Sequence, residues 1–424
     1  MSQLKDSGLL QLSAIVRAGM GMVTAFGLAH ALGDSEQGRY YVAVAVFSLL
    51  YLVLSTGVHV VTVSHVAQAE DRHEARRWLA FHLIVNGSVA VVLGLAGLAL
   101  PWVAPRVSGV SHEMAWWAAL LCWTPALELG RAWATAQLQS RRRMASLTRM
   151  EIAAEVTRAA LVLGGAIWTG SGLGAVVGWL IASGLSAPIS LLALARERGQ
   201  LNLPGTGEVI RHLREAPLGA GLREGIPYGV LRSSAMLVIE VLPALAVFHF
   251  GADEDVAHLR LAQRMAAGAL MLSSGLSRTA LPLLSAHSGD RAEFGRLWLR
   301  SSLFAGISVA AGWVVLLLLL PTLLTWLAPA EFVDPVRHLC LLLTPGLIAM
   351  ALGSSSSAFY VATGRTKTAA RIILVGAPLG ALAVLSGAAM SSPAGAAIGL
   401  SLAQQGELVH MIFVLRWLRE GRGT

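Results

Sequence analysis

Charged residues and cysteines are scarce in this sequence. Only 13% of the 424 residues are charged and 55% are hydrophobic, whereas a typical soluble domain is about 25% charged. The two cysteines, Cys122 and Cys340, lie in separate apolar segments, which excludes a disulfide framework. Because the sequence also has no CxxC motif and no metal-spaced His/Cys cluster, we expect neither a metal site nor a cofactor.

The sequence has no long polar region that could form a globular domain. At about 20 residues per span, about twelve apolar segments occupy most of the chain. Backbone groups in lipid must be satisfied within their own segment, so we predict an all-α polytopic membrane protein of about 12 transmembrane helices. The expected spans are 9–32, 40–66, 78–100, 115–139, 148–169, 175–195, 222–250, 256–286, 298–320, 336–360, 368–390 and 395–418.

Basic residues are concentrated in every second loop. The net charge of +8 is scattered over short loops instead of one soluble face, so no nucleic-acid partner is expected. The intervening loops hold only Arg39, Arg106 and Arg337 as basic residues and are otherwise acidic. The positive-inside rule therefore predicts that both termini are cytoplasmic.

The chain contains an internal repeat. The sequence Leu54-Ser55-Thr56-Gly57 recurs as Leu272-Ser273-Ser274-Gly275, and Asp71-Arg72 recurs as Asp290-Arg291. A repeat of six spans is even, so both halves enter the membrane from the same side and should be related by a pseudo-twofold axis along the membrane normal. We predict an N-terminal six-helix lobe at 1–198, a cytoplasmic linker at 199–221 and a C-terminal six-helix lobe at 222–424.

Three arginines follow one face of the apolar segment 256–287. Arg260, Arg264 and Arg278 align on a helix that advances about 100° per residue. An arginine near the bilayer centre costs between ~3 and ~17 kcal/mol, depending on the method, so this face needs a wet or anion-filled space. We interpret the row as the cationic wall of a translocation cavity. The alternatives are partners on a neighbouring helix, or snorkelling of Arg260 to the outer surface.

Arg17 and Arg232 occupy similar depths in the first and seventh helices, which are equivalent in the repeat. If both face the pseudo-twofold axis, they converge on one anionic group. Separate burial of each against glutamate or carbonyl partners is the alternative.

Other polar residues within the spans are candidates for cavity and coupling roles. The second helix carries Ser55, His59 and Thr62 along a polar face, which suits contact with sugar or water, or helix-to-helix packing. Glu240 is the first candidate for a coupling site, because burial favours the protonated form of a carboxyl group and lets it switch.

Several short motifs are similar to those of Wzx-type oligosaccharide flippases. These are Leu32-Gly33 followed by Gly38-x-Tyr40, the Ser-Thr-Gly57 turn, Ala362-Thr363-Gly364-Arg365-x-Lys367, and the stretch Ser391 to Gly399. That family belongs to the multidrug/oligosaccharidyl-lipid/polysaccharide (MOP) exporter superfamily. The resemblance extends over nearly the whole chain.

The resemblance implies a V-shaped pair of six-helix bundles in a bacterial cytoplasmic (inner) membrane. A cavity lined by helices one, two, seven and eight would carry a polyprenyl-diphosphate-linked oligosaccharide to the outer leaflet for surface polysaccharide assembly. Arg17, Arg232, Arg264 and Arg278 lie on three of these helices and would bind the diphosphate. Implied partners are membrane lipids, H⁺ or Na⁺ as coupling ion, and polysaccharide polymerase or ligase proteins. Many relatives have fourteen helices, including lipid II flippases, so twelve favours a surface-polysaccharide precursor.

The same residues give less support to two alternative functions. A MATE-like drug or metabolite cation antiporter needs buried carboxylates for its substrate, but arginines outnumber carboxylates on the candidate cavity helices. A membrane enzyme acting on polyprenyl-linked sugars usually has a long external loop with catalytic residues, whereas the expected external loops are short.

Overall fold

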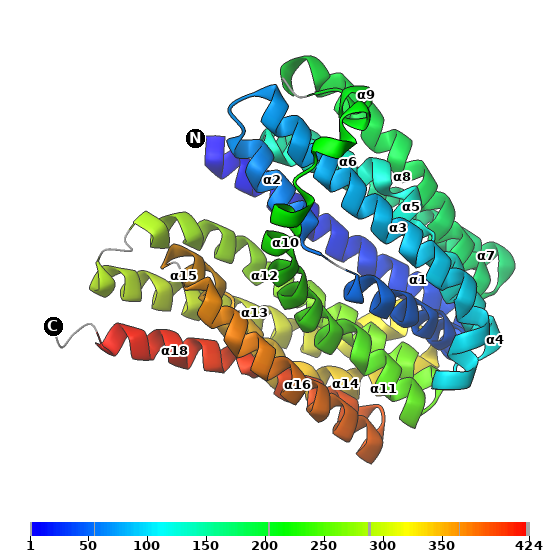
Figure 1. Cartoon of the computed structure of the whole chain (residues 1–424). Coiled ribbons are helices and arrows are strands. Elements are labelled where there is room, and N and C mark those ends of the chain that lie inside the picture. The colour runs from blue at the N-terminus through cyan, green and yellow to red at the C-terminus, as the bar shows by residue number, and fades with distance from the viewer. Residues whose placement is uncertain (1, 55, 202–203, 287–289, 364, 421–424) are drawn as a thin grey trace. The chain divides into compact units, whose positions relative to one another are not determined.

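The computed structural model describes residues 2–420 except 55, 202–203, 287–289 and 364. Throughout this part of the chain the regular secondary structure is helical (Figure 1). Eight of the described helices are long and apolar enough to cross a membrane. The prediction of an all-α polytopic protein is thereby confirmed.

The first six expected spans have helical counterparts in the same order. The first two merge into one long helix that Gly33 interrupts with φ 71° and ψ −179°, a backbone conformation that glycine adopts without a steric penalty. The helices of this half are α1 (Ser2–Val53), α2 (Val58–Gln68), α3 (Arg72–Ser108), α4 (His112–Leu121), α5 (Thr124–Leu127), α6 (Leu129–Ser140), α7 (Met144–Thr169) and α8 (Gly172–Leu201).

The next segment and the second half are also helical. Short helices α9 (Thr206–Arg211) and η1 (Leu213–Glu215) precede the seventh span, which is divided by a π-helical turn. The helices are α10 (Leu218–Met236), the π-helix η2 (Leu237–Val241), α11 (Leu242–Phe250), α12 (Asp253–Ala286), α13 (Arg291–Leu327), α14 (Ala330–Gly353), α15 (Ser356–Ala362), α16 (Thr366–Ser391), α17 (Ala394–Gln404) and α18 (Gly406–Glu420).

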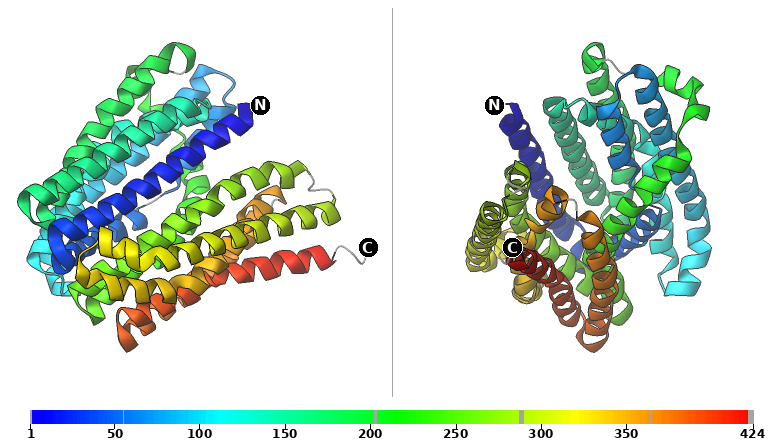
Figure 2. Two further views of the ribbon diagram at one scale, coloured as in Figure 1. Left: turned by 180° about the vertical axis from the view of Figure 1, so that it is seen from behind. Right: turned by 60° about the vertical axis from the view of Figure 1, so that its left-hand side comes forward.

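The helices pack into two compact units. One unit comprises α1 up to Tyr41 together with the chain from Leu237 onward, and the other comprises Val42–Met236. In the unit containing the C-terminal helices, α13, α14, α17 and α16 pack in succession; in the other unit, α7 and α8 form an antiparallel hairpin (Figure 2). The sequence repeat predicts a different division, into lobes at 1–198 and 222–424 with a linker at 199–221. That division stays a prediction.

The helix lengths support the internal repeat. Helices α3 and α13 both contain 37 residues, and α7 and α16 both contain 26. The side chain of Asp71 caps α3 by accepting a hydrogen bond from the Glu74 backbone N–H, and Asp290 caps α13 in the same way through Glu293. An aspartate at this position satisfies N–H groups that have no partner within the helix.

The segment before α10 is tied to the start of α3 by ion pairs. Arg76 donates a hydrogen bond of 2.8 Å to Glu215, and Arg72 lies 3.5 Å from Glu208. Partial desolvation opposes ionisation of Glu215, but the hydrogen bond from Arg76 and the charges of Arg76, His212 and His73 outweigh it and lower its pKa. Glu215 therefore keeps its charge, and the ion pair persists, to a lower pH than for an ordinary glutamate.

Equivalent glycines allow close helix contact in both halves. A Cβ atom at Gly165 would lie 2.1 Å from the Gly174 carbonyl oxygen, and one at Gly387 would lie 2.0 Å from the Gly395 carbonyl oxygen. The α7–α8 and α16–α17 hairpins thus use the same backbone approach. Small residues of this kind promote helix packing in membranes.

We expect Gly165→Ala to destabilise the protein by about 1–3 kcal/mol, because its methyl group would overlap backbone atoms. Gly164→Ala is the matched control, since no atom outside its own helix lies within 4 Å of its Cβ position. The unfolding temperatures of both variants in detergent are compared. Unfolding is detected as the loss of monodisperse protein on heating. Equal unfolding temperatures would contradict the close contact.

Candidate substrate and coupling site

Arg260 is a buried arginine in the helix that contains the predicted cationic row. It lies two turns into α12 and only 6% of its surface is exposed. Its guanidinium carbon lies 5.9 Å from the centre of the Tyr41 ring, and its Nη1 donates a hydrogen bond of 3.2 Å to Gln263 Oε1. Its Nε atom has no hydrogen-bond partner in the described part of the chain. An aromatic face and a neutral amide therefore hold this cation.

The amide of Gln263 connects this arginine to the π-helical turn η2. Gln263 Nε2 donates a hydrogen bond of 3.1 Å to the carbonyl oxygen of Ile239. A π-turn changes the backbone hydrogen-bond register, and such turns are frequent at functional sites. Because Gln263 Oε1 accepts from Arg260 while its Nε2 donates to Ile239, the amide forms a bridge from α12 to the seventh span.

Glu240, the candidate coupling residue, lies within the same π-turn. It is half-buried and exerts a favourable charge interaction on Arg260. The carboxylate thus lies in the neighbourhood of a cation on α12. Whether it couples transport to an ion gradient stays a prediction.

Arg264 differs from Arg260 although it lies only one turn further along α12. It is exposed and makes no salt bridge to any residue that the structure describes. Arg278 belongs to a stretch of α12 whose side chains lie outside the described residues. The row on α12 therefore begins with a buried cation held by Tyr41 and Gln263, followed by an exposed one.

Arg17 lies on the part of α1 that runs antiparallel to α12. Asp34 approaches His258 to 3.8 Å, and a Cβ atom at Gly268 would lie 2.9 Å from Met22 Sδ. At about 1.5 Å per residue, the backbone of Arg17 lies about 7 Å beyond the level of Met22. This level is between those of Arg264 and Arg278, and the Arg17 side chain is exposed.

Arg232 lies in the other unit, near the polar face of the second span. It is exposed and exerts charge interactions on both Tyr51 and His59. His59 Nε2 lies 2.9 Å from Gln139 Oε1. Thr62 is fully buried, and its hydroxyl has no hydrogen-bond partner in the part of the chain that the structure describes. Ser55 lies outside the described residues.

Two arginines within α6 and α7 have carboxylate partners instead. Arg131 lies 3.7 Å from Glu128 and 3.6 Å from Glu155, and Glu155 also pairs with Arg158. The Arg158 guanidinium stacks at 5.6 Å on the ring of Trp179. This network neutralises its charges internally, unlike Arg264 and Arg232, and has the features of a structural element.

Similarity to known proteins agrees with this fold. The first comparison structure is an inward-facing MATE multidrug-resistance transporter of the MOP superfamily, with 17% identity, 97% of this chain and 99% of that chain covered, and a TM-score of 0.72. The lipid II flippase MurJ matches with 15% identity, coverage of 97% and 87%, and a TM-score of 0.72. A eukaryotic MATE transporter matches with 14% identity, coverage of 100% and 98%, and a TM-score of 0.69. No curated protein sequence matches this chain.

These similarities define the class of protein as a polytopic membrane protein with the MOP transporter fold. The sequence adds the family. Residues 3–287 match the model of the family described as "Polysaccharide biosynthesis protein", and the chain belongs to that family. The predicted relationship to a polysaccharide family is thereby confirmed, and the fold is the one shared by the transporter and flippase structures named above.

Sequence reasoning missed the groups that hold Arg260. Gln263 follows Arg260 by three residues, a spacing at which helical side chains meet, and this polar residue in an apolar segment was the available signal. The contact with Tyr41 had no comparable signal, because it depends on the change of direction at Gly33.

The Arg260–Tyr41 contact leads to a stability prediction. We expect Tyr41→Leu to destabilise the protein by about 1–2 kcal/mol more than Tyr41→Phe, because phenylalanine keeps an aromatic face beneath the guanidinium. Thermal unfolding of both variants in the same detergent provides the comparison. If leucine and phenylalanine have the same effect, the aromatic face does not hold Arg260.

Proposed function

We propose that this protein is an alternating-access flippase. Its cargo is a polyprenyl-diphosphate-linked oligosaccharide, which it moves from the cytoplasmic to the outer leaflet of a bacterial inner membrane for surface polysaccharide assembly. Family membership supports a role in polysaccharide biosynthesis, and MurJ supports the use of this fold for a lipid-linked cargo. The distribution of basic loops supports cytoplasmic termini.

The observation that carries the proposal is the exposed Arg264 on α12, a helix that we expect to span the membrane. An arginine at membrane depth is stable beside water or an anion, and costly beside lipid. Arg17 lies at a neighbouring level of the same unit and is also exposed. A diphosphate matches this need, since guanidinium groups form paired, charge-assisted hydrogen bonds with phosphate oxygens.

The charges also distinguish this proposal from cation antiport. The MATE transporter and MurJ match the chain with the same TM-score of 0.72, so the fold does not choose between their cargoes. Among the proposed site residues of the unit that contains α12, Arg17 and Arg264 are exposed, whereas the carboxylate Glu240 is half-buried. A site with this balance favours an anionic cargo.

Glu240 is the proposed coupling group, with H⁺ or Na⁺ as the ion. Its position in the π-turn, within electrostatic range of Arg260, means that a change in its charge alters the interaction with α12. We also propose that polysaccharide polymerase or ligase proteins take over the exported glycan.

We expect Arg264→Ala and Arg278→Ala each to abolish export while the protein still inserts into the membrane, because each removes a diphosphate-binding cation. Arg264→Lys should retain partial activity, since lysine keeps the charge but loses the paired geometry. Accumulation of the lipid-linked glycan in a complemented deletion strain is the measurement.

Arg371→Ala is the matched control for these variants, because Arg371 is an exposed arginine on α16. It should support normal export. Normal export by both Arg264→Ala and Arg278→Ala would remove the cationic row from the mechanism.

We expect Glu240→Gln to weaken the dependence of flipping on an ion gradient, because the amide cannot exchange a proton or bind a cation by charge. Transport into proteoliposomes with and without imposed H⁺ or Na⁺ gradients tests this, with Glu331→Gln as a control at an exposed carboxylate. Unchanged gradient dependence would exclude Glu240 as the coupling group.

A further inference from the structure

The α7–α8 hairpin opens into a groove at the end opposite its connecting turn. The helices touch closely where Gly165 meets Gly174, next to the turn. Toward the start of α7 and the end of α8, a groove of about 350 Å³ lies between them, which is within the size range of ligand pockets, about 300–1,000 Å³. The groove belongs entirely to one unit of the protein.

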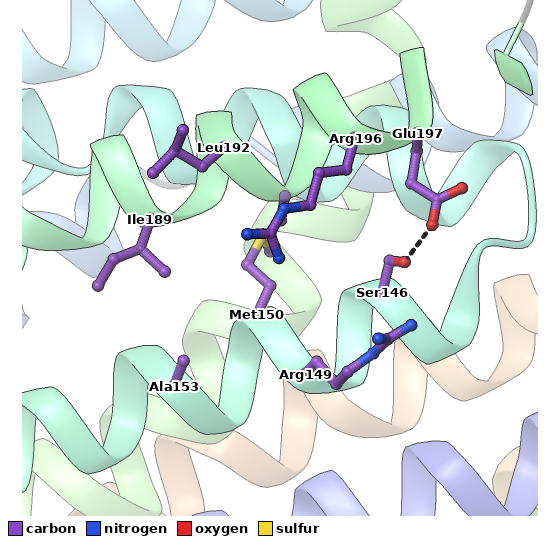
Figure 3. A pocket seen from close by; sticks show the side chains of 9 residues that line it. Ser146, Arg149, Met150, Ala153, Ile189, Leu192, Arg196 and Glu197 are labelled. Carbon is purple, nitrogen blue, oxygen red and sulfur yellow. Dashed lines mark hydrogen bonds between the residues drawn. The ribbon is translucent and has the colours of Figure 1, made fainter. Parts of the chain in front are cut away.

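The groove is lined by both apolar and basic side chains. Apolar side chains of the lining include Met150, Ala153, Ile189 and Leu192, and the basic side chains are Arg149 and Arg196 (Figure 3). Arg196 is seven residues beyond Ile189 on α8, or about 10 Å along the helix axis at 1.5 Å per residue. The backbone of Arg196 therefore lies nearer the end of α8 than that of Ile189, and the Arg196 guanidinium turns back toward Met150 (Figure 3).

The single carboxylate in the groove is already engaged. Glu197 accepts a hydrogen bond of 2.5 Å from the Ser146 hydroxyl, as Figure 3 shows, and lies 3.7 Å from Arg143. Arg149 and Arg196 are both exposed, and neither makes an ion pair with another residue in the described ranges. Two positive charges consequently remain available to an external anion.

We propose that this groove binds an anionic phospholipid of the leaflet on the arginine-rich side of the membrane. The phosphate lies between Arg149 and Arg196, and an acyl chain follows the apolar walls formed by Met150, Ile189 and Leu192. Basic pockets between transmembrane helices at this level suit anionic lipid headgroups. The groove shares no residue with the proposed cargo site, so the lipid proposal is tested independently of the flippase proposal.

The described residues of the second half of the repeat have a different arrangement at this position. At the corresponding position, Ile372 of α16 and Leu418 of α18 pack against a core that includes Phe359 and Trp417. Arg371 follows Arg149 by 222 positions, takes the equivalent place in the repeat and is exposed. It supplies a control arginine that lies outside the groove.

The test is native mass spectrometry of the full chain released from nanodiscs that contain equal amounts of phosphatidylglycerol and phosphatidylcholine. We expect the unmodified protein to retain one phosphatidylglycerol in preference to phosphatidylcholine. Arg149→Gln/Arg196→Gln should weaken this binding about tenfold to thirtyfold, since each arginine near an anionic lipid contributes roughly fivefold. Arg371→Gln/Arg419→Gln removes two exposed arginines elsewhere and should leave the binding unchanged.

A second variant tests the apolar part of the site without changing its charge. Ala193→Phe places a ring in the groove and should reduce phosphatidylglycerol retention in protein that still elutes as a single species. Equal retention of phosphatidylcholine, or equal losses in both double variants, would overturn the proposal. Displacement of the lipid by substoichiometric polyprenyl diphosphate would also overturn it, because the groove would then belong to the cargo pathway.

Discussion

Burying a guanidinium group away from water is the constraint on which the site depends. Such a charge persists at membrane depth only where its hydrogen bonds and its field are compensated. The protein meets this constraint for Arg260 with the Tyr41 ring and the Gln263 amide, and for Arg131 and Arg158 with carboxylates. A neutral amide and an aromatic face leave the net positive charge in place, whereas carboxylates cancel it. The first solution therefore maintains a positive potential along α12 that the second would remove.

The residues that hold Arg260 lie beside both points where the chain passes between the compact units. Tyr41 is the last residue of α1 in its unit, and Ile239 lies in the π-turn that follows the second passage at Leu237. Gln263 contacts Ile239, and Arg260 contacts Tyr41. A change in backbone conformation at either passage would thus alter the partners of one cation. This arrangement links the local structure of α12 to both connections between the two compact units.

Features that depend on residues close together in the sequence could be predicted, whereas features that depend on packing between distant segments could not. Apolar runs and the repeat of Asp71 at Asp290 predicted the helices and their caps, because spans and caps depend on local residues. The different environments of Arg260 and Arg264 were only partly predictable. Gln263 was a local signal for a partner of Arg260, but the contact of Arg260 with Tyr41 depends on the path of α1 after Gly33. Likewise, the division of the chain at Tyr41 and Leu237 depends on packing between distant segments, which no local pattern encodes.

The two halves of the repeat differ at the ends of their hairpin helices. They agree at the glycines where the two helices of each hairpin touch. The glycine contacts at Gly165 and Gly387 are equivalent, because a change at either would force two backbones apart. Beyond these contacts, α8 continues without interruption, whereas its counterpart is broken between Gln404 and Gly406 and packs an aromatic core. Positions constrained by backbone contact thus preserve the shared fold, and the free helix ends provide one half with a cationic groove and the other with a closed core. The described features that distinguish the two halves therefore involve side chains that the shared backbone contacts leave unconstrained.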